Sequence, residues 1–310
     1  MPTWATIDMG TNTFQMLLAE ITSPHALKKL RVEKRITRLG EGFSTEKRIR
    51  PQAAARAVSA LLHFKTILAG VHVDDVWVMG TSAVREAVNQ ADFLAQVKHE
   101  TGFDVCVISG EEEALCTFLG VNWVMENRAG PMVTIDIGGG STELVVAEGS
   151  DARYLTSLPL GVVHLAETHL GDDPIRPAAL AQMREQVDAA LDTVASRLPV
   201  ACRFAGTAGT ITTLAAVEQR LAPYRAEKIN HYALAVASVR RILKEMAVMT
   251  RAERMRVVGL ESGREDILVA GSVILLRVME RFSYDPVWVS DCGVREGTLI
   301  RRFQNGRTAL

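Results

Sequence analysis

The chain has 310 residues, which is long enough to form two domains with separate hydrophobic cores. Its hydrophobic fraction of 48% and charged fraction of 23% are typical of a soluble globular protein, and no apolar stretch reaches the roughly 18 residues that a membrane helix needs. The net charge of −1 gives no general attraction to polyanions, so we expect neither a nucleic-acid partner nor a membrane partner.

The first half of the chain predicts three strands followed by alternating helices and strands. The expected strands cover residues 4–9, 14–21, 28–38, 75–80 and 104–109, and the expected helices cover 51–69, 90–101 and 111–125. Pro51 is well placed to open its helix, because the first turn does not need its N–H.

A basic segment covers the third strand and the chain that leads from it to the first helix. It contains Lys28, Lys29, Arg31, Lys34, Arg35, Arg38, Lys47, Arg48 and Arg50, with only Glu33, Glu41 and Glu46 to balance them. One interpretation is a solvated edge hairpin, and the other is a positive rim that guides an anionic substrate. Phe43 is its lone aromatic residue, which gives little support for base stacking.

The second half repeats the order of the first. Its expected strands cover 132–137, 143–148, 153–158, 201–205 and 287–290, with helices at 177–198 and 294–304 and a helical insertion at 210–282. An amphipathic stripe marks the helix at 177–198. Three strands followed by alternating helices and strands, twice, predict an α/β fold with a mixed sheet and helices on both faces in each half.

Two pairs of glycine loops support an internal duplication. The strand that ends at Asp8 and Gly10 resembles the strand that ends at Asp136 and Gly138, 128 positions later. The segment 76–83 resembles 202–209, at an offset of 126. Two matches at nearly one offset predict two similar half-domains. Ligands of such sheets collect beyond the carboxyl ends of the strands, where these loops fall.

The expected domains follow from this repeat. Domain I covers 1–125 and domain II covers 126–297, because residues 126–131 are polar and turn-forming. We expect the last helix, about 298–310, to pack on domain I.

Asp8 and Asp136 each precede a glycine loop. Such an Asp can cap its own turn or hold a hydrated metal ion, and equivalent positions in both halves favour the metal. Glu143 can complete an oxygen ligand set for Mg²⁺ or can be a polar strand residue. The candidate phosphate-binding residues in the loops are Gly10, Thr11, Asn12, Thr13, Gly138, Gly139, Gly140, Ser141, Thr142, Gly206, Thr207, Gly209 and Thr210.

Three adjacent acids, Glu111, Glu112 and Glu113, open the helix at 111–125. Acids are favourable near the positive end of the helix dipole, which can account for Glu111 and Glu112. A carboxylate at this position can instead take a proton from an attacking water. Arg85 and Arg295 follow glycine loops, and their planar forks suit phosphate better than a helix start suits a cation.

Several other classes lack their motifs. The chain has no Gly-x-x-x-x-Gly-Lys-Ser/Thr phosphate loop, no Gly-x-Ser-x-Gly elbow and no His-x-x-x-His metal spacing. Its four cysteines form no Cys-x-x-Cys pair, and residues 1–4 lead into a strand without the features of a signal peptide. We therefore expect reduced thiols and a cytoplasmic protein.

Six motifs in order carry a resemblance to a known family. They are Asp8–Thr13, Arg38–Gly42, Gly80–Arg85, Ile108–Ala114, Asp136–Glu143 and Ala205–Thr210. Together they resemble the exopolyphosphatase/guanosine pentaphosphate phosphatase (Ppx/GppA) family of the actin-like ATPase superfamily, over residues 4–303. The resemblance implies two ribonuclease H-like (actin-like ATPase) domains with an active-site cleft between them, in the short form without C-terminal helical domains.

The resemblance also implies an activity and a set of roles. Family members remove the terminal phosphate of polyphosphate or of guanosine pentaphosphate (pppGpp) with Mg²⁺. Their catalytic Glu falls on Glu113, with Glu112 as a second candidate, and their phosphate-contacting Arg falls on Arg85. The Asp and Glu that flank the triple glycine fall on Asp136 and Glu143. The family usually has Arg where His164 stands, which implies a weaker phosphate contact, and it suggests a homodimer.

We therefore expect a Mg²⁺-dependent exopolyphosphatase, with Glu113 as the general base and with Asp8, Asp136 and Glu143 around the metal. The alternatives are a pppGpp 5′-phosphohydrolase, a non-catalytic sensor of guanosine polyphosphates, and a sugar or acetate kinase of the same superfamily. A kinase would need an acceptor and an adenosine site, and a sensor would bind nucleotide without turnover.

Overall fold

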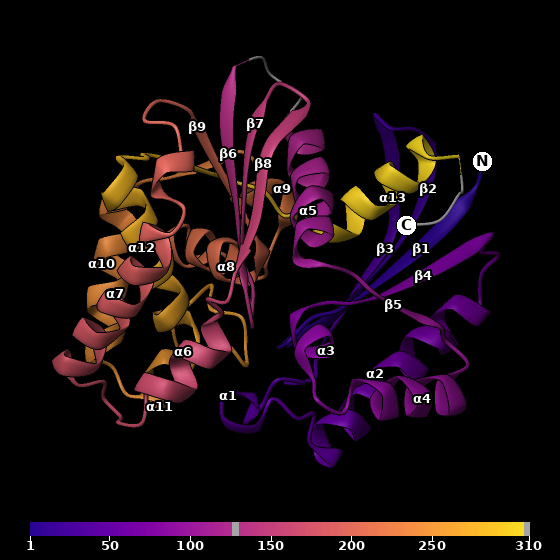
Figure 1. Cartoon of the computed structure of the whole chain (residues 1–310), viewed down its shortest axis with the longest axis horizontal. Helices are drawn as coiled ribbons and strands as arrows, with labels where there is room; N and C mark the ends of the chain where they lie inside the picture. The colour runs from indigo at the N-terminus through magenta and orange to yellow at the C-terminus, as the bar shows by residue number, and fades with distance from the viewer. Residues whose placement is uncertain (126–129, 307–310) are drawn as a thin grey trace. The chain divides into compact units, whose positions relative to one another are not determined.

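The computed structural model describes residues 1–125 and 130–306. It divides into two compact units (Figure 1). Unit 1 contains Met1–Trp123 and the C-terminal segment that begins at Val294, and unit 2 contains Val124–Gly293. Most of the predicted linker, residues 126–129, lies outside the described residues.

Unit 1 is built on a five-stranded sheet with the order β3-β2-β1-β4-β5. Its strands are β1 (Thr3–Met9), β2 (Thr13–Ser23), β3 (Ala26–Ile36), β4 (Asp75–Gly80) and β5 (Val105–Val107). Strands β1, β2 and β3 pair antiparallel, whereas β1, β4 and β5 pair parallel. The turn after β1 and the loops after β4 and β5 therefore leave the same edge of the sheet.

Helices cover both faces of this sheet (Figure 1). They are α1 (Phe43–Glu46), α2 (Pro51–Ala69), α3 (Ser82–Glu86), α4 (Gln90–Thr101), α5 (Gly110–Val124) and α13 (Val294–Gln304). Ala5, Ile7 and Met9 of β1 pack with α2 and α4, whereas Trp4 packs with Leu299 of α13. Since side chains alternate along a strand, Asp8 lies on the same face as Trp4. The short α3 was not predicted.

Unit 2 repeats this plan with one additional strand, in the order β10-β11-β9-β6-β7-β8. Its strands are β6 (Pro131–Ile137), β7 (Thr142–Glu148), β8 (Asp151–Leu158), β9 (Arg203–Thr207), β10 (Tyr232–Leu234) and β11 (Val287–Val289). Strands β8, β7, β6, β9 and β11 match β3, β2, β1, β4 and β5 in order and direction, so the predicted duplication is confirmed. The insertion that we predicted to be helical also contains a strand, β10, which pairs with β11 beyond the end of the insertion.

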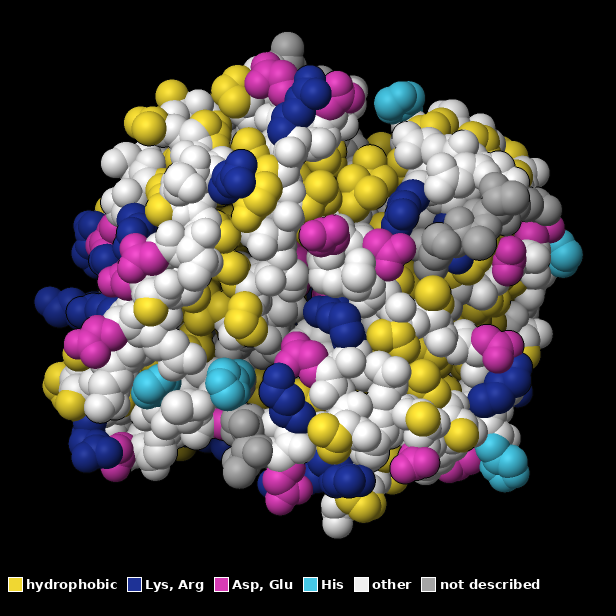
Figure 2. Space-filling view, viewed as in Figure 1, with side chains coloured by type: hydrophobic (Ala, Val, Ile, Leu, Met, Phe, Trp, Pro, Cys, Tyr) yellow, Lys and Arg dark blue, Asp and Glu magenta, His cyan; other side chains and the backbone are white. Residues whose placement is uncertain are grey.

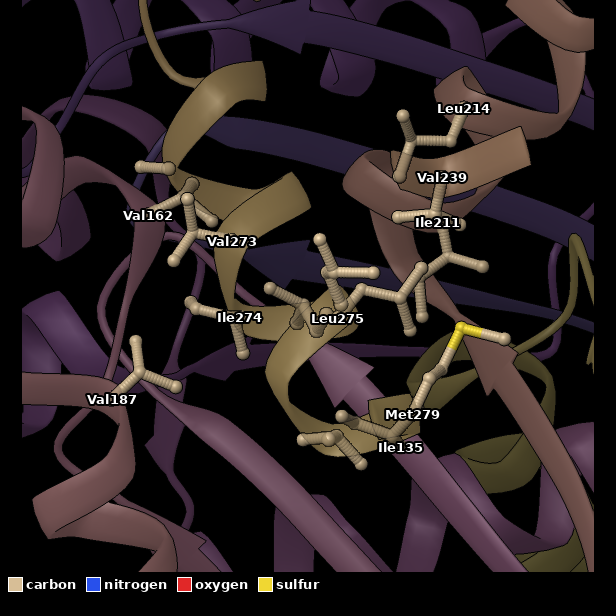
Figure 3. Close-up of a cluster of buried hydrophobic side chains, with 14 of the residues drawn as sticks. Ile135, Val162, Val187, Ile211, Leu214, Val239, Val273, Ile274, Leu275 and Met279 are labelled. Carbon is tan, nitrogen blue, oxygen red and sulfur yellow. The ribbon is translucent and has the colours of Figure 1, made fainter. Parts of the chain in front are cut away.

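The helices of unit 2 enclose a large hydrophobic core. They are α6 (Val162–His169), α7 (Pro177–Asp192), the 3₁₀ turn η1 (Ala195–Arg197), α8 (Ala208–Glu218), α9 (Ala226–Ile229), α10 (Val236–Val248), α11 (Arg251–Arg254) and α12 (Leu268–Phe282). In α12, 11 of 15 residues are buried. Figure 3 shows Val273, Leu275 and Met279 of α12 among side chains of other elements. A helix that is apolar on most sides belongs in a core. The predicted helix at 177–198 ends earlier, at Asp192.

Candidate functional site

Each unit begins its sheet with the same tight glycine turn. A Cβ atom on Gly10 would lie 2.8 Å from the backbone oxygen of Thr13, and one on Gly138 would lie 3.0 Å from that of Ser141. The Gly138 N–H donates to this Ser141 oxygen at 2.9 Å. Both turns therefore need glycine for the close approach of the backbone, and both leave the carboxyl end of their first strand.

In each unit, a second loop donates hydrogen bonds to the glycine turn. In unit 1 the Gly40 N–H donates to the Thr11 oxygen at 2.9 Å, and the Thr37 and Arg38 N–H groups donate to the Asn12 oxygen at 3.1 and 2.9 Å. These bonds tie the chain after β3 to the turn after β1. They fix the turn through its carbonyl oxygens rather than its N–H groups.

In unit 2 the chain after β8 makes the same kind of hydrogen bonds to its glycine turn. The Val162 N–H donates to the Gly138 oxygen at 3.1 Å, and the Val163 N–H donates to the Gly139 oxygen at 2.9 Å. Gly161 and Gly40 occupy equivalent places, each directly after a buried leucine. The shared Leu-Gly pair was a third trace of the duplication, which the sequence analysis missed.

The carboxylates predicted to hold the metal lie next to these turns. Asp136 and Glu143 face each other across the antiparallel pair β6–β7, and Glu143 is 2% exposed. Directly opposed residues have Cβ atoms about 4.5–5.5 Å apart, so the two carboxylates lie on one face. The Ser157 hydroxyl donates to Glu143 Oε1 at 2.7 Å. In unit 1 the buried Asp8 faces Gln15 instead.

Asp136 and Glu143 fit a magnesium ion better than they fit a closed metal centre. Among residues 1–125 and 130–306, no group of three or more His, Cys, Asp and Glu side chains is placed to hold a metal. Mg²⁺ is usually bound by one or two carboxylates together with waters and substrate phosphate oxygens. Two adjacent carboxylates beside a glycine turn meet that requirement.

The loops after β4 and β9 form the next part of each site. The Thr81 hydroxyl donates to the Met9 oxygen at 3.3 Å, so the loop after β4 contacts the end of β1. The Thr207 hydroxyl donates to the Cys292 oxygen at 2.9 Å, so this predicted phosphate ligand holds the loop after β11. Thr207 also precedes α8, whose first N–H groups have no partner within the helix and suit an anion.

Arg264 is a residue that sequence reasoning missed. A Cβ atom on Gly209 would lie 2.1 Å from its guanidinium carbon, so the guanidinium fills the space beside the Gly206–Thr210 loop. Its Nε donates to Glu261 Oε2 at 2.6 Å, and Arg264 is 7% exposed. No sequence motif around Arg264 predicts this contact, because the two residues are 55 positions apart in the chain.

Glu113 and Arg85 form a partly buried ion pair. Arg85 Nη1 lies 3.0 Å from Glu113 Oε2, and the two side chains are 22% and 13% exposed. The same Nη1 donates to the Ile108 oxygen at 2.9 Å. The structure therefore brings the predicted general base and a predicted phosphate ligand together at the carboxyl edge of β4 and β5.

Glu112 has a structural role in helix α5. The Ser109 N–H donates to Glu112 Oε2 at 3.0 Å, and the Glu112 N–H donates to Ser109 Oγ at 3.1 Å. This reciprocal pair is a capping box. Arg301 Nη1 lies 3.9 Å from the other carboxylate oxygen. The cap accounts for Glu112, which we leave out of the catalytic set.

Arg295 also has a different environment from the one predicted. Its side chain is 6% exposed, and its Nη2 lies 3.5 Å from Oε1 of the fully buried Glu296. Lys29 Nζ lies 2.7 Å from the same oxygen. Since Arg295 belongs to this cluster inside unit 1, we leave it out of the phosphate ligands.

One further titratable group lies near Glu113. Cys116 is one helical turn further along α5, and burial raises the pKa of its thiol. A buried, protonated thiol is a poor nucleophile, so Cys116 does not compete with the carboxylate for a catalytic role.

Ion pairs neutralise part of the basic segment. They join four of its nine cations to acids, Lys28 to Glu20, Lys29 to Glu296, Arg31 to Glu33 and Lys47 to Glu86, and its Glu41 pairs with Arg56 of α2. Lys and Arg side chains also stand beside Asp and Glu over much of the face in view in Figure 2. Strand β3 lies at a sheet edge, where charges discourage pairing with other chains. The structure thus favours the solvated edge hairpin over the positive rim.

Two findings bear on the environment of the chain. Within residues 1–125 and 130–306, every helix is too short or too polar to cross a bilayer. Cys106, Cys116, Cys202 and Cys292 are free thiols.

Comparisons with known proteins agree with this architecture. The model of the Ppx/GppA phosphatase family matches residues 17–305. Exopolyphosphatase 2 of Mycobacterium tuberculosis is 33% identical over 313 residues, which cover 96% of this chain and 97% of the relative. The guanosine-5′-triphosphate,3′-diphosphate pyrophosphatase of Aeromonas salmonicida is 30% identical, over 98% of this chain and 60% of the relative.

Solved structures show the same fold. An exopolyphosphatase from Cytophaga hutchinsonii has a TM-score of 0.90 at 29% identity, and the alignment covers 99% of both chains. A Ppx/GppA family member from Aquifex aeolicus has a TM-score of 0.83 at 29% identity, with the same coverage. The expected α/β class with two actin-like domains is confirmed, whereas the expected cleft between them stays a prediction. The chain belongs to the Ppx/GppA phosphatase family.

Proposed function

We propose that this protein is a Mg²⁺-dependent exopolyphosphatase that removes the terminal phosphate of inorganic polyphosphate. The observation that carries the proposal is the pair of Glu113 and Arg85, 3.0 Å apart at the carboxyl edge of the unit 1 sheet. The pair combines a carboxylate that can accept a proton with a cation that suits phosphate oxygens.

In the proposed reaction, Glu113 accepts a proton from a water molecule as the water oxygen bonds to the terminal phosphorus. The bond from that phosphorus to the bridging oxygen breaks, and its electron pair stays on the shortened chain. Arg85 and the backbone N–H groups of the glycine loops stabilise the charge on the transferred phosphoryl oxygens. The products are orthophosphate and a chain that is one phosphate shorter.

Asp136 and Glu143 are the residues that would hold Mg²⁺, whereas Asp8, the third predicted ligand, belongs to unit 1. When bound, the ion neutralises negative charge on phosphate oxygens. The part-buried Ser157–Glu143 hydrogen bond would orient one ligand oxygen, as supporting hydrogen bonds do around metal sites.

The coverage of the relatives favours polyphosphate as the substrate. The chain matches an exopolyphosphatase over 97% of that protein's length but a pppGpp-cleaving relative over only 60%. The pppGpp 5′-phosphohydrolase is the second candidate, because this relative is nonetheless 30% identical. We place the enzyme in the cytoplasm, since its four cysteines are free thiols.

The test is phosphate release by the purified chain from polyphosphate and from pppGpp, each with Mg²⁺ and with a chelator. We expect Mg²⁺-dependent release that is faster from polyphosphate. Faster release from pppGpp would establish the second candidate, and tight nucleotide binding without release from either substrate would make the chain a sensor.

A further inference from the structure

Arg56 of α2 binds three acceptors within one short segment of unit 1. Its Nε donates to the Thr37 oxygen at 2.6 Å. Its Nη2 donates to the Arg38 oxygen at 3.2 Å and to Glu41 Oε2 at 2.7 Å. Only an arginine side chain offers this many donors in one rigid plane.

Arg56 binds the same segment that donates hydrogen bonds to the first glycine turn. Thr37 and Arg38 present their carbonyl oxygens to Arg56 and their N–H groups to the Asn12 oxygen. Gly40, one residue before Glu41, donates to the Thr11 oxygen. A continuous series of hydrogen bonds therefore runs from α2 to the Gly10–Thr13 turn.

This segment has features that require an external support. Arg38 has a φ of +47°, a left-handed conformation that is costly for a residue with a side chain. The chain from Thr37 to Arg50 contains only the four-residue α1. In unit 2, by contrast, the equivalent segment leads at once into the eight-residue α6, whose first N–H groups reach the turn.

We propose that Arg56 is a positioning residue, which holds the Thr37–Glu41 segment and through it the Gly10–Thr13 turn in the form that binds phosphate. The inference rests on the proposed phosphate role of that turn. Arg56 acts on the backbone of the turn and not on the substrate. Its loss should therefore weaken substrate binding and transition-state stabilisation while the fold of unit 1 persists.

The test compares Arg56→Ala and Arg56→Lys with Lys65→Ala. Lys65 is a matched control because it lies on the same helix and donates to the Thr101 oxygen at 2.7 Å, away from the turn. We expect kcat/KM for phosphate release to fall about tenfold to a hundredfold in Arg56→Ala, as for other supporting groups. Arg56→Lys should recover part of the loss, methylguanidine should partly rescue Arg56→Ala, and Lys65→Ala should stay within twofold of wild type.

Amide hydrogen exchange gives a second readout that needs no activity. The peptides covering 37–43 and 10–13 should exchange faster in Arg56→Ala and at wild-type rates in Lys65→Ala. Unchanged exchange in these peptides, or a folded Arg56→Ala enzyme with wild-type kcat/KM, would overturn the inference. If the wild-type chain releases no phosphate, the proposed function fails, and the exchange data still decide whether Arg56 holds the turn. Should Arg56→Ala fail to fold, Glu41→Gln weakens the same contact and is judged by the same two readouts.

Discussion

The two units place different side chains on one shared scaffold. In unit 1 the row across the first three strands is Asp8, Gln15 and Lys34, and in unit 2 the corresponding row is Asp136, Glu143 and Ser157. Like charges directly opposite each other in a sheet are destabilising, so a row with two carboxylates suits a cation. The unit 1 row already contains a lysine. Duplication therefore preserved the backbone of the turn while the chemistry beside it diverged.

The support of the two turns differs as well. The position of the unit 1 turn depends on a side chain, since Arg56 holds the segment that donates hydrogen bonds to the turn. The unit 2 turn depends on backbone contact, because a Cβ atom on Gly161 would lie 2.3 Å from backbone atoms of Gly139 and Gly140. We infer that the glycine turn of unit 1 changes its backbone conformation more readily than the glycine turn of unit 2.

The largest expected effect comes from Glu113→Gln, which removes the proposed base but keeps the shape of the side chain. We expect turnover to fall by roughly 10²- to 10⁴-fold, because a general base contributes about that factor. Phosphate release should be measured together with thermal unfolding, which should change little. Glu111→Gln is the matched control, since Glu111 is an exposed acid in the same helical turn. Full turnover in Glu113→Gln would refute the assignment.

The second prediction tests the difference between the two rows. Glu143→Gln should raise the Mg²⁺ concentration for half-maximal activity by roughly tenfold to a hundredfold, because one of two proposed ligands is lost. Gln15→Ala, at the equivalent position of unit 1, should leave the Mg²⁺ titration within twofold of wild type. Magnesium titrations of phosphate release measure both. Equal shifts in the two variants would mean that the rows do not differ in this way.

The third prediction compares the cost in stability of replacing the glycines in the two loops that contact the glycine turns. Gly161→Ala should destabilise the protein by about 1–3 kcal/mol or more, since the new methyl group would meet backbone that cannot rotate away. Gly40→Ala should cost less, because its nearest neighbour is Thr11 Cγ2, a side-chain atom 2.3 Å away. Thermal and urea unfolding give both values. Adding Thr11→Ser to Gly40→Ala should recover stability, and an absence of recovery would count against the steric explanation.

Much of the fold could be predicted from the sequence, since apolar runs and glycine loops marked the ten equivalent strands. Strand β10 could not be, because three residues carry no pattern and pair only once β11 is in place. Helix α6 was missed for a related reason, as it begins where Gly161 meets the glycine turn. Short elements that depend on distant contacts leave little trace in the local sequence.

The candidate site was predictable in its residues but not in its contacts. Spacing and resemblance identified Arg85 and Glu113, yet their ion pair joins residues 28 positions apart. Arg264 has no local signature, because its significance lies in its contact with Gly209. The cap at Ser109 and Glu112 could have been found, since Ser-x-x-Glu before an apolar run is the pattern of a capping box.

The smallest expected effect compares two capping boxes, one in each unit. Ser109 and Glu112 cap α5, which carries Glu113, whereas Thr250 and Glu253 cap the four-residue α11. Ser109→Ala and Thr250→Ala should each lower the free energy of unfolding by about 1 kcal/mol, the usual cost of losing such a cap. Only Ser109→Ala should also lower kcat, by a few-fold, because the first turn of α5 orients Glu113 against Arg85. If both variants lose the same stability and keep full kcat, the cap of α5 has no part in positioning the base.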